Sequence, residues 1–320
     1  MRDGKPHILI LTDGKMGDLV QCRGIAAALT APDLIKEEVL SPGWLTALPL
    51  PNMPISAVDR QLGIFSLGVD IVIASGRRML PYLRAFKNLV SPSPMTVFLK
   101  DPKFNHRDID LIWAPSHDNL RGENVISTLT SPHTLTAEML ADESKSTPSK
   151  FASLPKPRTG IILGGNSKAV QWNQDTSKRF ANCVAKLPPD SGLIITASRR
   201  TPDILKSTVR LTLDGRQSEF LDAASDISFF DILAACDRLV LTGDSHNMMS
   251  EALATGAPVH FFRPPGLHAK LQWFLDTLES QQLAFNVEHG FSEAGSKPLN
   301  ATVEIATEIQ KKFDQFRPAS

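Results

Sequence analysis

The chain has 320 residues, more than one hydrophobic core usually holds, so two domains of ordinary size are expected. Its 34 basic and 34 acidic side chains balance, which excludes the strongly basic field that recruits nucleic acid by charge alone. The three cysteines, Cys22, Cys183 and Cys236, are widely spaced and odd in number, which favours reduced thiols over a disulfide framework or a zinc site.

Apolar runs are short throughout the sequence. None reaches the 18 residues of a membrane span, and the first is too short for a signal peptide. We therefore expect a soluble, cytoplasmic protein, an expectation that is compatible with a peripheral membrane contact.

The first half of the chain contains four compact apolar runs, typical of buried parallel strands, at residues 7–11, 70–74, 95–99 and 111–114. A helix is expected over 21–29. A doubly wound sheet brings the carboxyl ends of its strands to one edge. The polar residues that follow these runs should therefore converge there: Asp13, Lys15, Asp18, Ser75, Arg77, Asp101, His117 and Asp118.

Several of these features allow two interpretations. The turn after the first strand lacks the G-x-G-x-x-G spacing and the G-K-[ST] of a P-loop, so Lys15 either meets an anion or belongs to an ordinary turn. His117 beside Asp118 fits a surface turn or a catalytic dyad. The apolar stretch 41–54, SPGWLTALPLPNMP, fits a loop packed on its own domain, or else a lid or membrane-facing patch.

A polar, proline-bearing stretch within 131–158 indicates a linker between domains. A second α/β domain is expected after it, with strands at 160–163 and 193–196. The first of these strands ends in Gly164-Gly165-Asn166 and the second in Ser198-Arg199-Arg200-Thr201. Guanidinium groups at such a strand end match phosphate oxygens well, although solvated arginines are the alternative.

Residues 237–265 have the order strand, polar loop, helix, strand of one βαβ unit, with strands at 239–241 and 259–262. The loop Gly243-Asp244-Ser245 leads into a helix that carries Ser250 and Glu251, and Gly256 ends that helix. Because a helix N-terminus favours anions, a phosphate-bearing ligand is predicted here, and Glu251 can accept hydrogen bonds from ribose hydroxyls. Alternatively, the loop forms only a turn and a helix cap.

Taken in order along the chain, these motifs resemble the mitochondrial fission "elongated mitochondria" family, whose bacterial members have been labelled nucleoside-diphosphate-sugar epimerases. They are Asp13-Gly14-Lys15, Gln21, Ser75-Gly76-Arg77-Arg78, Asp101-Pro102, Pro115-Ser116-His117-Asp118, Gly164-Gly165, residues 196–202, Asp244-Ser245, Ser250-Glu251-Ala252, Thr255-Gly256 and Pro258-Val259. The family is similar to GT-B glycosyltransferases. The resemblance therefore implies an α/β fold of two Rossmann-like, doubly wound parallel-sheet domains that face each other across a cleft.

The resemblance also implies a division of the chain into an N-terminal acceptor-side domain at 1–148, a C-terminal nucleotide-sugar domain at 149–300, and a final helix at 301–320 that packs back on the first domain. Two further amphipathic helices are expected from the sequence pattern, at 229–236 and 271–283.

Site roles follow from the resemblance. The residues expected to bind the donor nucleotide are Gly165, Asn166, Ser198, Arg199, Arg200, Thr201, Asp244, Ser245, Ser250, Glu251 and Gly256. The residues expected on the acceptor side are Asp13, Gly14, Lys15, Gly17, Gln21, Ser75, Gly76, Arg77 and Asp101. Asp18 and His117 are the catalytic candidates, and no metal or cofactor is expected, because helix dipoles and basic residues can stabilise a leaving diphosphate.

The chain departs from the family pattern at Asp18, where a histidine is usual, and at residues 227–230, where the family has Asn-Pro-Tyr. An ordinary carboxylate is a weaker base than histidine near neutral pH. A short-chain-type epimerase is excluded, because the only tyrosine, Tyr82, is followed by Phe86 at the position of the catalytic lysine.

Three functional hypotheses remain. The first is a glycosyltransferase that moves a sugar from a nucleoside-diphosphate donor to an unidentified acceptor. The second is a non-catalytic adaptor on the same scaffold, with unknown protein partners, as the role of the plant relatives in recruiting fission machinery implies. The third is a ligand sensor that binds nucleotide without turnover.

Overall fold

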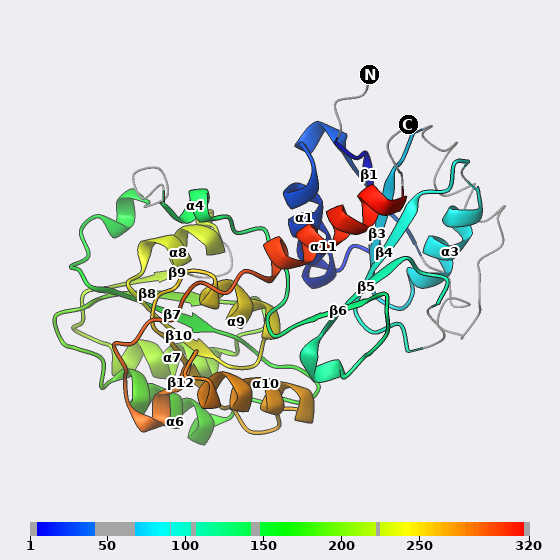
Figure 1. Cartoon of the computed structure of the whole chain (residues 1–320). Helices are drawn as coiled ribbons and strands as arrows, with labels where there is room; N and C mark the ends of the chain where they lie inside the picture. Colours follow the sequence, from blue (N-terminus) through cyan, green and yellow to red (C-terminus); the bar gives the residue numbers. More distant parts are fainter. Residues whose placement is uncertain are drawn as a thin grey trace. The chain divides into compact units, whose positions relative to one another are not determined.

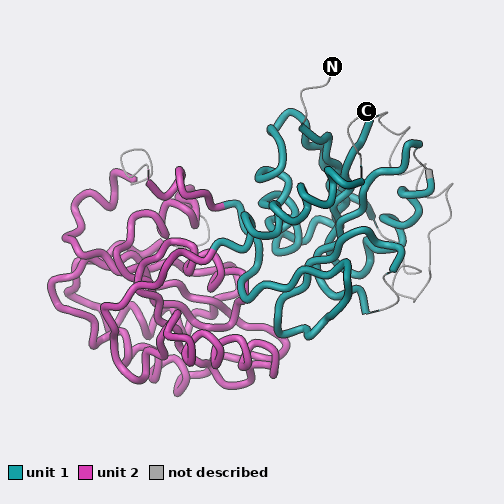
Figure 2. The backbone as a smooth tube through the Cα atoms, viewed as in Figure 1, with its two compact units in different colours: residues 1–134, 300–320 teal, residues 135–299 magenta. Residues whose placement is uncertain are grey.

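The structure is a computed structural model and describes residues 5–41, 68–89, 91–103, 107–141, 148–221 and 225–316. The chain forms two compact units (Figure 2). Unit 1 comprises residues 1–134 with 300–320, and unit 2 comprises residues 135–299. Most of the predicted lid or packed loop at 41–54 lies outside the described residues.

Unit 1 contains a sheet of six parallel strands (Figure 1). The strands are β1 (Ile8–Thr12), β2 (Ile35–Val39), β3 (Ile71–Ser75), β4 (Met95–Leu99), β5 (Leu111–Pro115) and β6 (Val125–Thr128). Their order in the sheet is β2-β1-β3-β4-β5-β6. All residues of the four central strands are buried, which is why each one appears in the sequence as a continuous apolar run.

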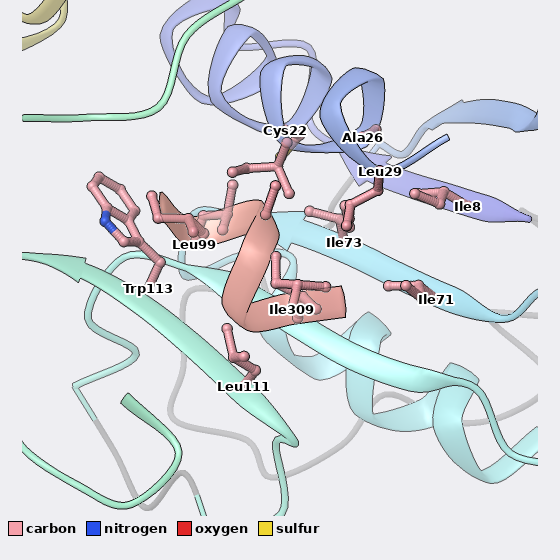
Figure 3. Packing of buried hydrophobic residues seen from close by; sticks show 14 of the residues in the cluster. Ile8, Cys22, Ala26, Leu29, Ile71, Ile73, Leu99, Leu111, Trp113 and Ile309 are labelled. Carbon is pink, nitrogen blue, oxygen red and sulfur yellow. The ribbon is translucent and has the colours of Figure 1, made fainter. Parts of the chain in front are cut away.

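The two faces of this sheet are covered by different helices. Ile8, Ile71 and Leu99 point to the face under α1 (Met16–Leu29) and α11 (Ala301–Phe316), as Figure 3 shows. Alternate residues such as Leu9 and Val72 pack on the other face with α3 (Leu80–Leu89). Short helical turns are η1 (Pro32–Leu34) and η3 (Ser116–Asp118).

Helix α11 follows unit 2 in the sequence but belongs to the core of unit 1. Its residues Ile305, Ile309 and Phe313 recur every four positions, so they lie on one face of the helix, and they join the cluster beneath α1. At its N-terminal end the hydroxyl of Thr302 donates to the carbonyl of His133 at 2.8 Å and accepts from the His133 N–H, also at 2.8 Å. These contacts fix the end of the chain on unit 1.

Unit 2 contains a second sheet of six parallel strands, in the order β12-β11-β10-β7-β8-β9. The strands are β7 (Arg158–Leu163), β8 (Gly192–Ala197), β9 (Ser218–Leu221), β10 (Arg238–Thr242), β11 (Val259–Phe262) and β12 (Phe285–Asn286). The helices are α4 (Ala137–Ala141), α6 (Gln174–Val184), α7 (Asp203–Thr212), α8 (Phe229–Ala235), α9 (His246–Leu253) and α10 (Ala269–Ser280), with short turns η4 (Ser149–Phe151) and η5 (Val287–His289).

The predicted α/β class with parallel sheets is confirmed in both units. All eight predicted strands are present, within two residues of their expected ends. The helix predicted from residue 21 begins earlier, at Met16, and the helix predicted over 271–283 spans Ala269–Ser280. None of the helices in the described ranges is both long and apolar enough to cross a membrane.

Candidate functional site

The loop after β10, residues 243–245, lies at the carboxyl edge of the unit 2 sheet. Gly243 is crowded, because a Cβ there would lie 3.0 Å from Leu275 Cδ1 and 3.1 Å from the carbonyl oxygen of Phe262. Ser245 caps α9, its side chain accepting from the Met248 N–H at 3.4 Å. The N-terminus of α9 therefore starts at this edge, as the sequence predicts.

Asp244 connects this loop to the loop after β7. Its carboxylate accepts from the Gly165 N–H at 3.2 Å and from the Thr242 hydroxyl at 2.6 Å. The same hydroxyl oxygen accepts from the Gly164 N–H at 2.6 Å. Burial raises the pKa of Asp244, although these hydrogen bonds and the charge of Arg200 act in the opposite direction.

Glycine is required at positions 164 and 165, because atoms of Asp244 and Arg200 lie where a side chain would begin. A Cβ at Gly164 would lie 2.1 Å from Oδ1 of Asp244, and a Cβ at Gly165 would lie 2.3 Å from the carbonyl of Arg200. The next residue, Asn166, donates its N–H to that carbonyl at 3.0 Å and accepts from the Trp172 N–H through Oδ1 at 2.9 Å. The loop after β7 is thus held from both sides.

The loop after β8, residues 198–202, completes the cluster. The hydroxyl of Thr201 lies 2.6 Å from the carbonyl of Gly164, and its oxygen accepts from the Ser198 N–H at 2.8 Å. In contrast, the side chains of Arg199 and Arg200 are exposed. No hydrogen bond or ion pair joins either guanidinium group to a residue in the described ranges. These two cations remain available to an anion.

Glu251 lies on α9, six residues after the cap Ser245, about 9 Å further along the helix axis. Burial alone raises the pKa of its carboxyl to about 7. Within the described part of the chain no hydrogen bond or ion pair to this carboxyl is found. A largely desolvated acid without a donor is costly in a folded protein and marks a candidate ligand site.

Two of the predicted donor residues serve α9 itself. Ser250 is fully buried, and its hydroxyl donates to the carbonyl of His246 at 2.8 Å. Gly256 has φ +76° and lies beyond the C-terminal end of the helix, where a Cβ would be 3.1 Å from Pro298. The structure therefore brings six predicted residues into one network: Gly165, Asn166, Ser198, Arg200, Thr201 and Asp244. Gly256 lies at the opposite end of α9.

In unit 1 the turn after β1 is compact. Gly14 has φ +79°, a conformation that favours glycine, and Lys15 Nζ lies 2.5 Å from Oδ2 of Asp13. Burial acts to raise the pKa of Asp13, but the hydrogen bonds and charge of Lys15 outweigh it and lower that pKa. Gly17 follows in the first turn of α1, and Gln21 is buried one turn later.

Asp18, a predicted catalytic residue, is buried in the first turn of α1 and forms an ion pair with the ammonium group of Lys100. Lys100 follows β4 with φ +101°, a region that a residue with a side chain rarely adopts. Gly76, after β3, leaves room for the pair, because a Cβ there would lie 3.1 Å from Asp18 Oδ2. Asp18 thus joins the ends of three strands.

The other predicted residues of unit 1 lie around this pair or near it in sequence. The hydroxyl of Ser75 donates to the carbonyl of Leu99 at 3.1 Å, and Arg77 is exposed. Asp101 accepts from the Lys103 N–H at 2.8 Å. His117 Nε2 lies 3.7 Å from Asp118 Oδ1, which is longer than a hydrogen bond.

Two residues of these sites were not among the candidates from the sequence, Thr242 and Lys100. Both lie at a strand end, Thr242 as the last residue of β10 and Lys100 directly after β4, and that position was the available signal. Among the described residues no group of three histidine, cysteine or carboxylate side chains is placed to hold a metal ion.

A hollow of about 690 Å³ lies away from these two sites, between α1 and α11, and none of the predicted site residues lines it.

Comparison with known proteins identifies the family. The family described as Mitochondrial fission ELM1 matches residues 16–313, nearly the whole chain. The chain belongs to this family. Within it, an uncharacterized protein of Rickettsia prowazekii, RP120, is 27% identical over 95% of this chain and 98% of its own length. Mitochondrial fission protein ELM1 of Arabidopsis thaliana is 24% identical over 77% of this chain, which spans 64% of the plant protein.

Solved structures that align with nearly the whole chain include enzymes named for UDP-sugars. UDP-GlcNAc 2-epimerase from Neisseria meningitidis, bound to UDP-GlcNAc, aligns with a TM-score of 0.56 at 13% identity over 96% of this chain and 99% of that one. A UDP-glucosyltransferase from Polygonum tinctorium aligns with a TM-score of 0.54 at 10% identity over 98% and 93%. The ELM1-family chain therefore has a GT-B-like fold. The absence of a Tyr-x-x-x-Lys pair excludes a short-chain-type epimerase, but it does not exclude an epimerase with the GT-B-like fold.

Proposed function

We propose that the chain binds a nucleoside-diphosphate sugar at the carboxyl edge of the unit 2 sheet and transfers the sugar to an acceptor. The observation that carries the proposal is Glu251, a largely desolvated carboxyl with a pKa of about 7 and no recorded partner among the described residues. The vicinal hydroxyls of a ribose are suitable donors for such a group.

The neighbouring loops support the same ligand. Arg199 and Arg200 are exposed at the end of β8, and guanidinium groups match the oxygens of a diphosphate bidentately. The N-terminus of α9 adds a favourable dipole. The fold is also shared with a UDP-glucosyltransferase and with a UDP-GlcNAc 2-epimerase.

In the proposed transfer, the arginines and the α9 dipole stabilise the negative charge that develops on the leaving diphosphate, without a metal ion. The role of Asp18 as the base that accepts the proton of the acceptor hydroxyl requires its carboxylate to be released from Lys100. His117 is the second candidate for that proton. The acceptor is unidentified.

Two alternatives have support of their own. The ammonium group of Lys100 pairs with Asp18, the expected base, and this pairing favours a binding or adaptor protein. The family match is compatible with this alternative. The shared fold with UDP-GlcNAc 2-epimerases favours isomerisation of the same donor. Analysis of the products formed from a nucleotide sugar, with and without added acceptors, separates transfer, epimerisation and binding without turnover.

The first experiment is thermal unfolding of the wild type and of Glu251→Ala in a panel of nucleoside diphosphates and their sugars. A ligand at about a hundred times its dissociation constant should stabilise the protein by about 2.7 kcal/mol and raise the midpoint by a few degrees. Glu251→Ala should lose this shift. If no member of the panel raises the wild-type midpoint, the proposed function is wrong, and the adaptor hypothesis takes its place.

A further inference from the structure

The amide groups of the loop after β7 are already used within the protein. Four consecutive N–H groups have acceptors: Gly164 donates to Thr242 Oγ1, Gly165 to Asp244 Oδ2, Asn166 to the carbonyl of Arg200, and Ser167 to the carbonyl of Val170. A glycine loop that cradles phosphate needs these donors directed at the ligand. Here two of them are directed at Thr242 and Asp244.

Asp244 is also in close steric contact with this loop. An added Cβ at Gly164 would lie 2.1 Å and 2.3 Å from the two carboxylate oxygens, so no other residue type fits there while Asp244 keeps its position. Asp244 is thus packed against the loop as a bound anion would be. Its second oxygen is satisfied by the Thr242 hydroxyl at 2.6 Å.

The cations of the neighbouring loops have no hydrogen bond or ion pair of this kind within the described residues, although the charge of Arg200 acts on Asp244 and opposes the rise in its pKa that burial causes. Arg199 and Arg200 after β8, and Lys168 after β7, are exposed, and no ion pair joins them to a residue in the described ranges. The backbone of Arg200 is nevertheless fixed, because its carbonyl accepts from Asn166 and its N–H donates to Ser198 Oγ at 3.2 Å. The backbone of the loop is therefore held, whereas no hydrogen bond or ion pair to the described residues fixes its guanidinium groups.

From this contrast we infer that Asp244 is a positioning residue, an internal carboxylate that occupies the amide donors of the β7 loop, so that Arg199 and Arg200 of the β8 loop form the phosphate subsite. The inference rests on the proposed function for its ligand, a nucleoside diphosphate. It reverses the expectation that Gly165, Asn166 and Asp244 bind the donor nucleotide, and leaves them the task of holding the β8 loop in place.

The role of Asp244 as a positioning residue is tested without any ligand, by a double-mutant cycle measured in thermal unfolding. Gly164→Ala should lower the midpoint by several degrees in the wild type and by much less in an Asp244→Ala background, because the methyl group then has room. Asp244→Ser, which also removes the atoms that the methyl group would meet, replaces Asp244→Ala as the background if Asp244→Ala is too unstable. Additive effects of Gly164→Ala and Asp244→Ala would overturn the assignment of Asp244.

The phosphate subsite at Arg199 and Arg200 is tested by titration calorimetry with UDP and uridine as probes. The ratio of their affinities should fall at least tenfold in Arg199→Gln and in Arg200→Gln, because each removes a charge-assisted contact. In Asp244→Asn, and in the control Lys178→Gln on α6, the ratio should stay within threefold of the wild type. Glu251→Gln should weaken both probes and leave their ratio unchanged.

Each contrary result has a distinct meaning. An unchanged ratio in both arginine variants, or a ratio that falls tenfold in Asp244→Asn, would overturn the phosphate subsite. If the wild type binds neither probe, the proposed function and the phosphate subsite fail together. The double-mutant cycle still decides whether Asp244 positions the β7 loop.

Discussion

Glu251 and Asp244 lie seven residues apart in the sequence, yet their surroundings differ. Both are desolvated carboxyls with a raised pKa, but Asp244 has two hydrogen-bond donors and Glu251 has none recorded among the described residues. A partnered carboxyl serves the structure that surrounds it. An unpartnered one is costly unless a ligand or a proton satisfies it, which is why Glu251 is central to the proposed function.

The raised pKa of Glu251 predicts a pH-dependent stability. The folded protein holds this proton up to about pH 7 and the unfolded chain only up to about 4.5, so stability falls as pH rises through that window. Glu251→Gln should remove the fall and stabilise the protein at pH 8 by about 3 kcal/mol at most. Denaturant unfolding of both proteins at pH 5 and pH 8 measures the difference, and an equal effect of the substitution at both pH values would contradict the assignment.

Gly165 provides a second test at this scale. Gly165→Ala brings a methyl group against the backbone of Arg200, at 2.3 Å before relaxation, and should cost more than about 2 kcal/mol of unfolding free energy. Gly215→Ala is the control, because its Cβ meets nothing within 4 Å and its cost reflects only the φ of +77°. Equal costs for the two variants would show that the loops are not in close contact.

The sequence could place these residues at a strand end but could not orient them. Asp244 was expected near a diphosphate, whereas its carboxylate turns towards the backbone of the neighbouring loop. That orientation depends on the register of β7 against β10, in which Ile162 lies opposite Leu241, and on the absence of a side chain at Gly164. Neither is visible in a single sequence.

At the scale of elements, the strands absent from the prediction share one property. Four were not predicted, and each lies at the edge of a sheet: β2, β6, β9 and β12. Edge strands are only partly buried, so β2 has the sequence IKEEV with none of its residues fully buried, and β12 has two residues. Central strands, buried on both faces, produced apolar runs and were all found.

His260 holds the segment that follows η5 against the central strand β11. It is fully buried in β11, and its Nε2 accepts from the Ser292 N–H at 2.9 Å. Burial first, and then the charge of Arg238, lowers its pKa to about 4. The neutral form therefore contributes stability above pH 6.5, and that contribution is lost as pH falls through 4.

His260→Gln, which keeps an acceptor, should be less sensitive to acid than the wild type. Between pH 6.5 and pH 4 we expect the wild type to lose about 3 kcal/mol more stability than the variant. Urea unfolding at the two pH values measures this difference. A parallel decline of both proteins would show that other groups cause the acid sensitivity.

At the scale of the whole molecule, the chain closes unit 1 with its last helix. Ile305, Ile309 and Phe313 of α11 complete the cluster under α1, so residues 1–134 alone would expose that apolar face. A fragment of residues 1–134 should therefore unfold without a cooperative transition, and an added peptide of residues 300–320 should restore one. Cooperative unfolding of the fragment alone would contradict this account.

The fold and the membership of the ELM1 family were within reach of the sequence, because motifs at strand ends recur in order along the whole chain. The chemical roles of the site residues were harder to predict from the sequence. Asp18 was expected to act as a base, and its ion pair with Lys100 depends on the unusual backbone conformation of Lys100, which no local pattern in the sequence indicates.

The central claim is that Glu251 binds a nucleotide in unit 2, and titration calorimetry with UDP tests it most directly. The wild type and the control Glu304→Ala, an exposed glutamate on α11, should bind UDP equally. Glu251→Ala should weaken binding at least tenfold, as expected when a hydrogen bond to a charged group is lost. Equal affinity of all three proteins for UDP, or no binding by any of them, would contradict the account.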